Sequence, residues 1–398
     1  MRKNIIRQRV ITVIILSSFV ALSLVTKGCR KDDNNSAVWL QVATNTIYAV
    51  AIKTDGTLWA WGQGPLEQKL NRDSPNSYPP KSIPFPTQIG IDADWKQVAC
   101  GSSHNVAIKT DGTLWAWGWN RNGELGLKDR DEHLSPVQVG TNTNWGQVAC
   151  GASHNAAIKT DGTLWAWGVN SAGVLGLEDK ITCTLPTQIG RDTNWQKVAC
   201  GFIHTLAIKT DGTLWSWGGN GYGQLGLGAS DNSPHPAPIQ IGTETNWQQV
   251  AGGQWYTLAV KTNGTLWAWG DNKCGQLGIG NTLACNLPTR VGIYTNWLEV
   301  ACSREHTLAI KTDGTLWGWG NDENYQLGVE YKKYHLTPAQ VGKDINWKQV
   351  AAGASYTLVI KTDNTMWGWG NNYYGQLGLG IINDYDLHHD PTKVKTIR

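Results

Sequence analysis

The chain has 398 residues, with 23 tryptophans and 46 glycines but only 3 phenylalanines and 2 methionines. An ordinary core fills with whichever apolar side chain fits each gap, so this bias indicates that Trp and Gly recur at fixed positions. The formal net charge is +3, but five of the 34 basic residues precede Gly28, in a segment that we expect to be removed. The remaining 29 basic and 31 acidic residues lack the basic field that neutralises phosphates, which disfavours nucleic acid as a partner.

Residues 1–28 have the pattern of a signal peptide. Four positive charges lie before Val10, and an uncharged apolar run of 16 residues follows, which is short for a membrane span of about 20 residues. Residues 29–36 then form a polar tether. This start resembles that of a bacterial lipoprotein, which implies a lipidated Cys29 and export to the cell envelope, although Thr26 and Lys27 depart from the lipoprotein pattern. Secretion of an unlipidated chain and an uncleaved short anchor remain open.

Residues 37–398 repeat one unit seven times. The string Thr-Asp-Gly-Thr-Leu-Trp-x-Trp-Gly recurs with small changes at spacings of 56, 50, 50, 52, 50 and 50 residues, and Trp-x-x-Val-Ala precedes each copy. A period near 50 is typical of propeller blades, which are small antiparallel sheets that bury both faces only by stacking. We therefore predict an all-β fold, a seven-bladed β-propeller. The first Trp of each string lies at Trp59, Trp115, Trp165, Trp215, Trp267, Trp317 and Trp367.

Each unit predicts its own strands. Two apolar runs flank Asp111-Gly112, a hairpin signal for which we expect a type I′ turn. The following strand is apolar on both faces, which predicts burial between two blades. The Lys before each turn, such as Lys109, is expected to be a solvated strand end. A short Pro-containing segment follows as an outer strand, where Pro is tolerated.

The order of these pieces suggests how the ring closes. The chain opens on a Trp-x-x-Val-Ala strand and finishes on Pro391-Thr392-Lys393-Val394, so one outer strand is left over at the end. We expect this C-terminal strand to pair with the N-terminal blade, which removes the exposed edges of an open array.

The combined pattern of each unit is Gly-x-x-His, a hairpin, Trp-Gly-x-Asn-x-x-Gly-Gln-Leu-Gly and Pro-x-x-Val. It resembles the regulator of chromosome condensation repeat family, which forms seven-bladed propellers, and it covers essentially residues 37–398. The first unit departs from it, with an altered segment at Gln63 and a longer loop to Pro86. Family members include an exchange factor for a small nuclear GTPase, a plant ultraviolet-B photoreceptor and a secreted bacterial inhibitor of β-lactamases. The resemblance therefore implies the fold, and the function must be argued from the site.

Two pairs of residues per unit vary while their surroundings repeat. The first pair lies inside Gly-x-x-His, and the second follows Trp-Gly-x-Asn. Variable loops on one propeller face lie together, and large aromatic or apolar groups there are typical of protein interfaces, although incidental surface variation would look the same. The candidate partner-binding residues are Phe202, Ile203, Gln254, Trp255, Arg304 and Glu305 from the first pair, and Trp119 and Tyr222 near the second.

Histidines and cysteines recur by unit. The Gly-x-x-His position holds four His and three Tyr, and repeated positions spread around a ring, whereas the ligands of a metal converge on one ion. We therefore expect a packing or hydrogen-bonding role, with no metal and no cofactor. Cys100, Cys150, Cys200 and Cys302 share a position with Thr, Gly or Ala elsewhere, which predicts free thiols in small buried slots.

The sequence favours a non-catalytic, monomeric propeller that binds a protein partner in the bacterial envelope. No nucleophile and base order, unique carboxylate pair or phosphate-binding loop indicates an enzyme. A carbohydrate-binding surface propeller is the alternative, which a cluster of Trp119, Trp255 and Tyr222 with polar neighbours would favour. Nucleotide exchange is less favoured, because the insertion from Gln63 to Phe85 is a poor candidate for a protruding wedge. Light sensing is disfavoured because the photoreceptor's Gly-Trp-Arg-His-Thr string is missing.

Overall fold

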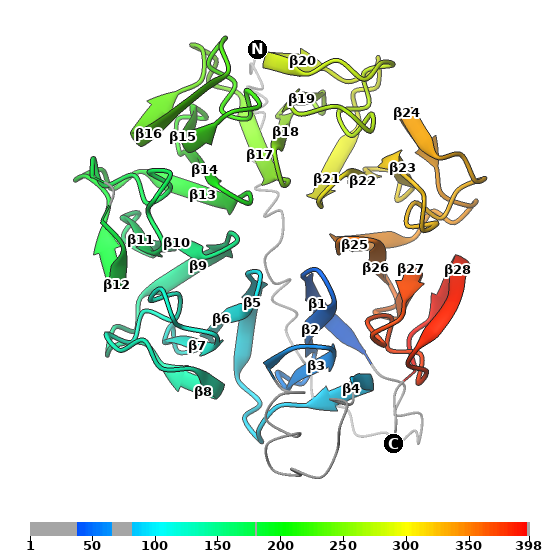
Figure 1. Ribbon diagram of the computed structural model, residues 1–398, viewed down its shortest axis with the longest axis horizontal. Coiled ribbons are helices and arrows are strands. Elements are labelled where there is room, and N and C mark those ends of the chain that lie inside the picture. The colour runs from blue at the N-terminus through cyan, green and yellow to red at the C-terminus, as the bar shows by residue number, and fades with distance from the viewer. Residues whose placement is uncertain (1–37, 66–81, 180, 396–398) are drawn as a thin grey trace, which may run out of the picture. The chain divides into compact units, whose positions relative to one another are not determined.

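The computed structural model describes residues 38–65, 82–179 and 181–395. These residues form 28 strands in seven four-stranded antiparallel sheets, and each sheet uses four consecutive strands. We number these sheets blades 1 to 7 in chain order, from β1–β4 to β25–β28. Figure 1 shows them arranged as a ring, which confirms the seven-bladed all-β prediction. The predicted signal peptide, Cys29 and the tether of residues 29–36 lie outside the described residues.

The first strand of each blade lies nearest the ring centre and the fourth lies outermost (Figure 1). The innermost strands are β1 (Trp39–Thr44), β5 (Trp95–Cys100), β9 (Trp145–Cys150), β13 (Trp195–Cys200), β17 (Trp247–Gly252), β21 (Trp297–Cys302) and β25 (Trp347–Ala352). The second strands are β2 (Tyr48–Lys53), β6 (His104–Lys109), β10 (His154–Lys159), β14 (His204–Lys209), β18 (Tyr256–Lys261), β22 (His306–Lys311) and β26 (Tyr356–Lys361).

The third strands carry the Trp-x-Trp pairs and the fourth strands carry most of the prolines. The third strands are β3 (Leu58–Gly62), β7 (Leu114–Gly118), β11 (Leu164–Gly168), β15 (Leu214–Asn220), β19 (Leu266–Gly270), β23 (Leu316–Asn321) and β27 (Met366–Asn372). The outer strands are β4 (Ile83–Gln88), β8 (His133–Gln138), β12 (Cys183–Gln188), β16 (Asp231–Gln240), β20 (Cys285–Arg290), β24 (Tyr334–Gln340) and β28 (Asp384–Lys393). Over the described part of the chain, no helix is long and apolar enough to span a membrane.

The hairpin turn differs from the predicted type I′ turn. The N–H of Gly112 donates to the carbonyl of Lys109 at 3.0 Å, and the N–H of Lys109 donates to the carbonyl of Thr113 at 3.0 Å. Gly112 has φ of +80°, whereas Asp111 does not have a positive φ. The turn is therefore a type I turn followed by one left-handed residue, the three-residue hairpin loop. Asp111 accepts bonds from the N–H and hydroxyl of Thr113, which explains the conserved spacing of these two residues in the repeat.

The lysine before this turn is buried, so the prediction of a solvated strand end is wrong. In blade 2, Lys109 is 7% exposed, and its Nζ lies 4.8 Å from the ring centre of Trp95 and 4.5 Å from that of Trp115. The ammonium group also forms ion pairs with carboxylate oxygens of Asp92 and Asp94 at 2.8 and 3.1 Å. The two rings and two carboxylates replace the water that a buried ammonium loses.

Tryptophan also joins neighbouring blades. The second Trp of each Trp-x-Trp pair is buried, and in six blades its indole Nε1 donates to a backbone carbonyl of the preceding blade. For example, Trp217 Nε1 lies 2.8 Å from the Val174 carbonyl oxygen. Burying a Trp with its one donor satisfied gives large apolar contact without leaving an unpaired N–H. The repeated Trp thus packs between neighbouring sheets, as the sequence predicted.

The ring closes between blades 7 and 1, but the predicted strand pairing is wrong. The C-terminal strand β28 pairs with β27 of its own blade, because each unit already supplies all four strands and β4 fills the outer edge of blade 1. Closure instead uses the contacts that join any two blades. Trp61 Nε1 donates to the Gln376 carbonyl at 2.8 Å, and the Tyr356 hydroxyl donates to the Tyr48 carbonyl at 2.6 Å. One apolar cluster includes side chains of both blades, Val394 among them.

Candidate partner-binding face

The two variable pairs of each unit lie on one face of the propeller. The turn between the first and second strands and the loop after the third strand lie at the same end of an antiparallel blade. In every blade a backbone N–H of that loop donates to the carbonyl of the second variable residue, as from Gly219 to Ile203 at 2.8 Å and from Asp271 to Trp255 at 2.9 Å. We call this end the loop face, and the end with the Thr-Asp-Gly turns the hairpin face.

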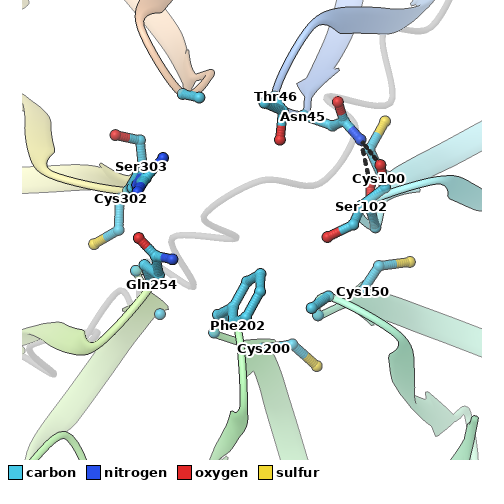
Figure 2. Close-up of a pocket in the computed structure, with 18 of the residues that line it drawn as sticks. Asn45, Thr46, Cys100, Ser102, Cys150, Cys200, Phe202, Gln254, Cys302 and Ser303 are labelled. Atoms are coloured by element: carbon cyan, nitrogen blue, oxygen red, sulfur yellow. Dashed lines mark hydrogen bonds between the residues drawn. The ribbon is translucent and has the colours of Figure 1, made fainter. Parts of the chain in front are cut away.

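The first variable residue of every blade lines the mouth of the central channel, a cavity of about 410 Å³. Figure 2 shows Thr46, Ser102, Phe202 and Gln254 around this mouth. The residue is small in blades 1, 2, 3 and 7 but large in blades 4, 5 and 6, where it is Phe202, Gln254 and Arg304. The mouth is therefore asymmetric, with one arc of large side chains.

Four of the predicted residues converge on blades 4 and 5. The rings of Phe202 and Trp255 meet edge to face at 5.2 Å, and Tyr222 stacks on Trp255 at 5.3 Å. Lys273 Nζ lies 4.9 Å from the Tyr222 ring centre, on the same loop face. Ile203, Tyr222 and Trp255 line one groove of about 320 Å³. Phe202 remains 39% exposed, so the cluster presents apolar surface to solvent beside the channel mouth.

The other predicted residues of the arc are polar. Arg304 is the one charged side chain among the described residues that line the channel mouth, and its nearest carboxylate contact is Glu305 at 3.8 Å. Glu305 also accepts a bond from the Asn321 side chain at 2.9 Å. Arg304 is 64% exposed, so this pair is screened by water and leaves the guanidinium available. The N–H of Gln254 donates to the Ser303 carbonyl at 3.1 Å, which fixes the turn of blade 5.

Trp119 does not join this cluster. It lies on blade 2, 40% exposed, with the Arg121 guanidinium 5.1 Å from its ring centre. The predicted clustering of Trp119, Trp255 and Tyr222 is thus observed only for the last two. The order of the units was the available signal, because Trp119 belongs to the second unit whereas Tyr222 and Trp255 belong to the adjoining fourth and fifth units.

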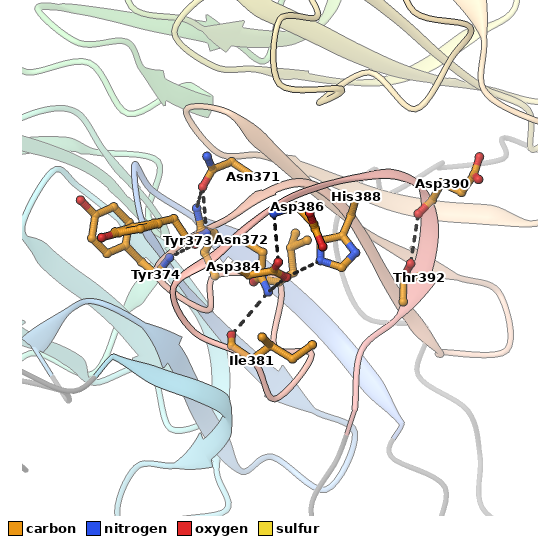
Figure 3. Close-up of polar contacts among 12 residues, drawn as sticks. Asn371, Asn372, Tyr373, Tyr374, Ile381, Asp384, Asp386, His388, Asp390 and Thr392 are labelled. Carbon is orange, nitrogen blue, oxygen red and sulfur yellow. Dashed lines mark hydrogen bonds and ion pairs between the residues drawn. The ribbon is translucent and has the colours of Figure 1, made fainter.

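A second aromatic patch was missed by the sequence analysis. Tyr325 of blade 6 stacks on His389 of blade 7 at 3.7 Å with an angle of 6° between their planes, and Tyr331 lies 4.8 Å from Tyr325. Tyr325 has φ of +57°, where the repeat has a positive-φ Gly in five other blades. The replacement of the repeated Gly by Tyr325 was the signal in the sequence that could have indicated this patch. In the loop of blade 7 shown in Figure 3, the rings of Tyr373 and Tyr374 meet edge to face with their centres 4.8 Å apart.

The predicted hydrogen-bonding role of the Gly-x-x-His position is confirmed. His154 Nε2 lies 3.0 Å from the Thr205 hydroxyl of the next blade, and the Tyr256 hydroxyl donates to the His306 carbonyl at 2.6 Å. Burial lowers the pKa of His154 and of His204 to about 3, so both are neutral at physiological pH. No group of three or more potential metal ligands occurs among the described residues.

The repeated cysteines are free, as predicted, but they are only partly buried and line the channel (Figure 2). Cys200 and Cys302 point their thiols at carbonyls of the preceding blade, 3.6 Å from Ala149 O and 3.7 Å from Ala251 O. Surrounding protein raises the pKa of both to about 12, so they are protonated and poor nucleophiles.

The sequence analysis also missed a ring of side chains on the innermost strands. The third residue of Trp-x-x-Val-Ala is Gln in five blades, Lys197 in blade 4 and Glu299 in blade 6. Gln97 donates from Nε2 to the Val148 carbonyl at 3.1 Å and accepts from the Val148 N–H at 3.2 Å. Gln41 and Gln147 make the same two bonds to the next blade, and Gln349 accepts from the Val42 N–H, whereas Gln249 Oε1 has no partner among the described residues. In these four blades the position links adjacent inner strands.

Comparison with known proteins agrees with this architecture. The family model described as "RCC1-like domain" matches residues 25–296 and 189–398. The chain belongs to the RCC1-like domain family. Among solved structures with a similar fold, Prp20p of Saccharomyces cerevisiae has a TM-score of 0.74 at 21% identity, covering 88% of each chain. Human WBSCR16 has a TM-score of 0.70 at 22% identity, covering 79% of this chain and 86% of its own. These likenesses show the shared fold alone.

Two curated relatives match over shorter segments. The ultraviolet-B receptor UVR8 of Arabidopsis thaliana is 35% identical over 96 residues, which are 24% of this chain and 21% of the receptor. The Protein RCC2 homolog of Danio rerio is 33% identical over 110 residues, which are 27% of this chain and 21% of that protein. Both matches span about a fifth of the relative's length.

Proposed function

We propose that this RCC1-like propeller is a non-catalytic, protein-binding module of the bacterial envelope, and that it binds its partner with the loop-face arc of blades 4 to 6. The observation that carries the proposal is the convergence of Phe202, Trp255 and Tyr222 from two blades into one partly exposed aromatic cluster. Exposed aromatic anchors beside a concave site are the residue classes that dominate binding at protein interfaces. The arc is defined by Phe202, Ile203, Tyr222, Gln254, Trp255, Arg304 and Glu305.

The arc also indicates what the partner presents. Its aromatic half on blades 4 and 5 suits an apolar side chain, and Arg304 and Lys273 are positive groups on its exposed margin. An exposed partner loop with an apolar side chain next to a carboxylate would match both halves. The channel mouth of about 410 Å³ has room for such a loop tip.

Relatives support a binding role. The solved structure of Prp20p is described together with its binding properties to Gsp1p and histones, and yeast RCC1 (Prp20) has been solved bound to Kap60. Propellers of this fold therefore serve as platforms for protein partners. The particular partners do not transfer at 20 to 21% identity, so the site on this chain must be tested directly.

The test is affinity purification of the full chain from the envelope of its own organism, with the partner identified by mass spectrometry. We expect a stoichiometric protein that is lost when Phe202→Ala and Trp255→Ala are combined. Trp119→Ala is the matched control, because it removes an exposed Trp from the same face outside the arc. Equal recovery with all three proteins would remove the arc from consideration.

A carbohydrate-binding propeller is the second candidate. The groove of about 320 Å³ combines Tyr222 and Trp255 with the polar side chains of Ser171, Asn220 and Asn232, which is a composition that also suits a sugar. Retention of the full chain on immobilised envelope glycan, abolished by Trp255→Ala, would support this candidate. Retention of a protein partner instead, with no glycan binding, would exclude it.

Display on the envelope is part of the proposal and has its own test. If Cys29 is lipidated, the exported chain partitions with membranes, and Cys29→Ser releases it to the soluble exported fraction. A wild-type chain that is soluble and lacks a lipid in intact-mass analysis would instead support secretion. Neither outcome bears on the loop-face arc.

A further inference from the structure

Blade 6 carries carboxylic acids at two positions where the repeat elsewhere carries amides. On the innermost strand, Glu299 occupies the position of Gln97 and its equivalents. In the loop after the third strand, Asp322 occupies the position that is Asn in blades 2, 3, 4, 5 and 7. Both acids lie in one blade, and at both positions the amide has a defined hydrogen-bonding task. The Asn residues are Asn120, Asn170, Asn220, Asn272 and Asn372.

The amide in the loop makes two bonds that a carboxylate cannot both make. In blade 3, Asn170 accepts from the Leu175 N–H at 2.9 Å and donates to the Asp179 carbonyl at 2.9 Å. In blade 7, Asn372 makes the same pair with Leu377 and Ile381, and Figure 3 shows its donating side. A carboxylate keeps the accepted bond but has no hydrogen to donate, so it leaves a loop carbonyl unsatisfied.

Asp322 shows this deficit. Its Oδ1 accepts from the Leu327 N–H at 2.9 Å, like the Asn in other blades. Its Oδ2 is buried without a hydrogen-bond partner, and the side chain is 0% exposed. His335 Nε2 lies 3.9 Å away, beyond hydrogen-bond range, and donates to the Glu330 carbonyl at 3.1 Å. A proton on Oδ2 would restore the missing donor.

The charged groups around Asp322 do not supply a counter-charge. Burial lowers the pKa of His335, so its neutral form is favoured, and Lys333 pairs with Glu323 at 2.9 Å. Burial raises the pKa of Asp322 to about 7. The charged and titratable groups of the surrounding turns and strand are Arg304, Glu305, Glu323, Tyr325, Glu330, Tyr331, Lys332, Lys333, Tyr334 and His335.

Glu299 has the same difficulty at the seam with blade 7. It accepts from the Val350 N–H at 3.2 Å, as Gln97 does from Val148. Gln97 also donates to the facing valine carbonyl, and an ionised Glu299 has nothing to donate there. Neighbouring blades surround the carboxyl and raise its pKa to about 7.

Charged groups on the strands packed against β21 are already engaged. Lys311 lies 3.7 Å from the Trp317 ring centre, Lys348 donates to the Asn364 side chain, and Lys261 pairs with Glu244 at 2.6 Å. The other titratable groups on those strands are His306 and Tyr256. Burial lowers the pKa of His306 to about 3, so it carries no positive charge to offset an ionised Glu299.

We infer that blade 6 is a pH-sensitive segment of the ring, closed while the carboxyl groups of Glu299 and Asp322 are protonated and loosened when they ionise. In acid form each carboxyl reproduces both bonds of the amide it replaces. Ionisation leaves a buried charge against a backbone carbonyl, at the seam with blade 7 and beneath the loop that adjoins Glu305. No other blade carries an acid at either position: blade 4 has Lys197 at the first, blade 1 has Gly64 at the second, and all the remaining residues are amides.

The test is hydrogen exchange of the full chain between pH 5 and pH 8, corrected for intrinsic exchange. For wild type we expect protection at the Val350 and Leu327 amides to fall about tenfold per pH unit between pH 5 and pH 7 and then to level off. Glu299→Gln should abolish the fall at Val350, and Asp322→Asn should abolish it at Leu327. Both variants install the residue used by other blades, so folding is not in question.

A transplant of the acid provides the matched control. Gln97→Glu in blade 2 should create at Val148 the pH dependence that wild type shows at Val350. The inference would be overturned if amide protection depended on pH in the same way in wild type, Glu299→Gln and Asp322→Asn. A Gln97→Glu variant whose Val148 amide stays insensitive to pH would overturn it as well.

Discussion

The lysine that is buried at the end of the second strand in blades 2 to 7 offers a quantitative test of how the propeller accommodates a buried charge. Lys109 and Lys159 lie in almost identical aromatic cages, with ring distances of 4.8 and 4.5 Å against 4.7 and 4.0 Å. They differ in their acids. Lys109 pairs with Asp92 and Asp94, and these bonds raise its pKa over the opposing effect of burial, whereas burial lowers the pKa of Lys159.

Replacing each lysine by Met keeps the apolar stem and removes the charge. The Lys159→Met change loses attraction to the rings but also relieves the cost of burying an unpaired ammonium, so we expect a change within about 0.5 kcal/mol. The Lys109→Met change additionally loses two ion pairs to half-exposed carboxylates, worth about 0.3 to 1 kcal/mol each after screening. We expect it to cost about 0.6 to 2 kcal/mol more than Lys159→Met.

Urea unfolding followed by circular dichroism measures this difference without adding salt. The excess cost of Lys109→Met should shrink in 1 M NaCl, because screening weakens partly exposed pairs. Equal costs for the two variants, or an excess that is insensitive to salt, would refute the assignment of that energy to Asp92 and Asp94.

Three further outcomes follow from the described contacts. His204 is neutral in the folded state with a pKa of about 3, so below pH 6.5 the unfolded state binds a proton that the folded state does not. The free energy of unfolding therefore falls by up to about 1.4 kcal/mol for each pH unit of acidification. His204→Tyr should reduce this slope by the contribution of one proton, and an unchanged slope would contradict the prediction. A Cβ on Gly201 would overlap the His204 ring and lie 2.7 Å from the Gly253 carbonyl oxygen, so Gly201→Ala should lower the urea midpoint strongly. Gly146→Ala, whose nearest contact is the Ile158 carbonyl oxygen at 3.3 Å, should change the midpoint much less, and equal midpoints for the two variants would disprove the clash. Tyr325 has a left-handed backbone conformation, whose cost is compensated by the stacking of its ring on His389. Tyr325→Ala, which loses the stack and keeps the strain, should therefore be less stable than Tyr325→Gly by about 1 kcal/mol. The reverse order of stability in urea unfolding would refute this compensation.

The repeat made the fold accessible from sequence, since the spacing of Trp and Gly defines the blades without any knowledge of contacts. The errors arose where the arrangement of the strands within one blade was not apparent from the repeat. Lys109 looked like a strand end because its two Trp partners come from the first and third strands of the sheet. The C-terminal strand looked left over because the unit was counted from the wrong strand, whereas β28 completes its own blade.

The candidate site was accessible only in part. Phe202, Trp255 and Tyr222 stood out as large residues at variable positions, and the structure brings all three together. Trp119 stood out equally, but it lies on another blade. Sequence variation marks which loops are free to differ, whereas their meeting in space depends on which blades adjoin. Glu299 and Asp322 were overlooked because an acid at one amide position is a small departure, and its meaning depends on the bonds that the amide makes.

Site-specific photo-crosslinking in intact cells tests the loop-face arc most directly. A benzoylphenylalanine placed at Phe202 reports on the arc, and one placed at Ile293, which is 84% exposed in the loop before β21 on the hairpin face, reports on the opposite face. We expect a discrete protein adduct from position 202 that disappears when Trp255→Ala is added, and no adduct from position 293. An adduct from position 293 with none from position 202 would contradict partner binding by blades 4 to 6.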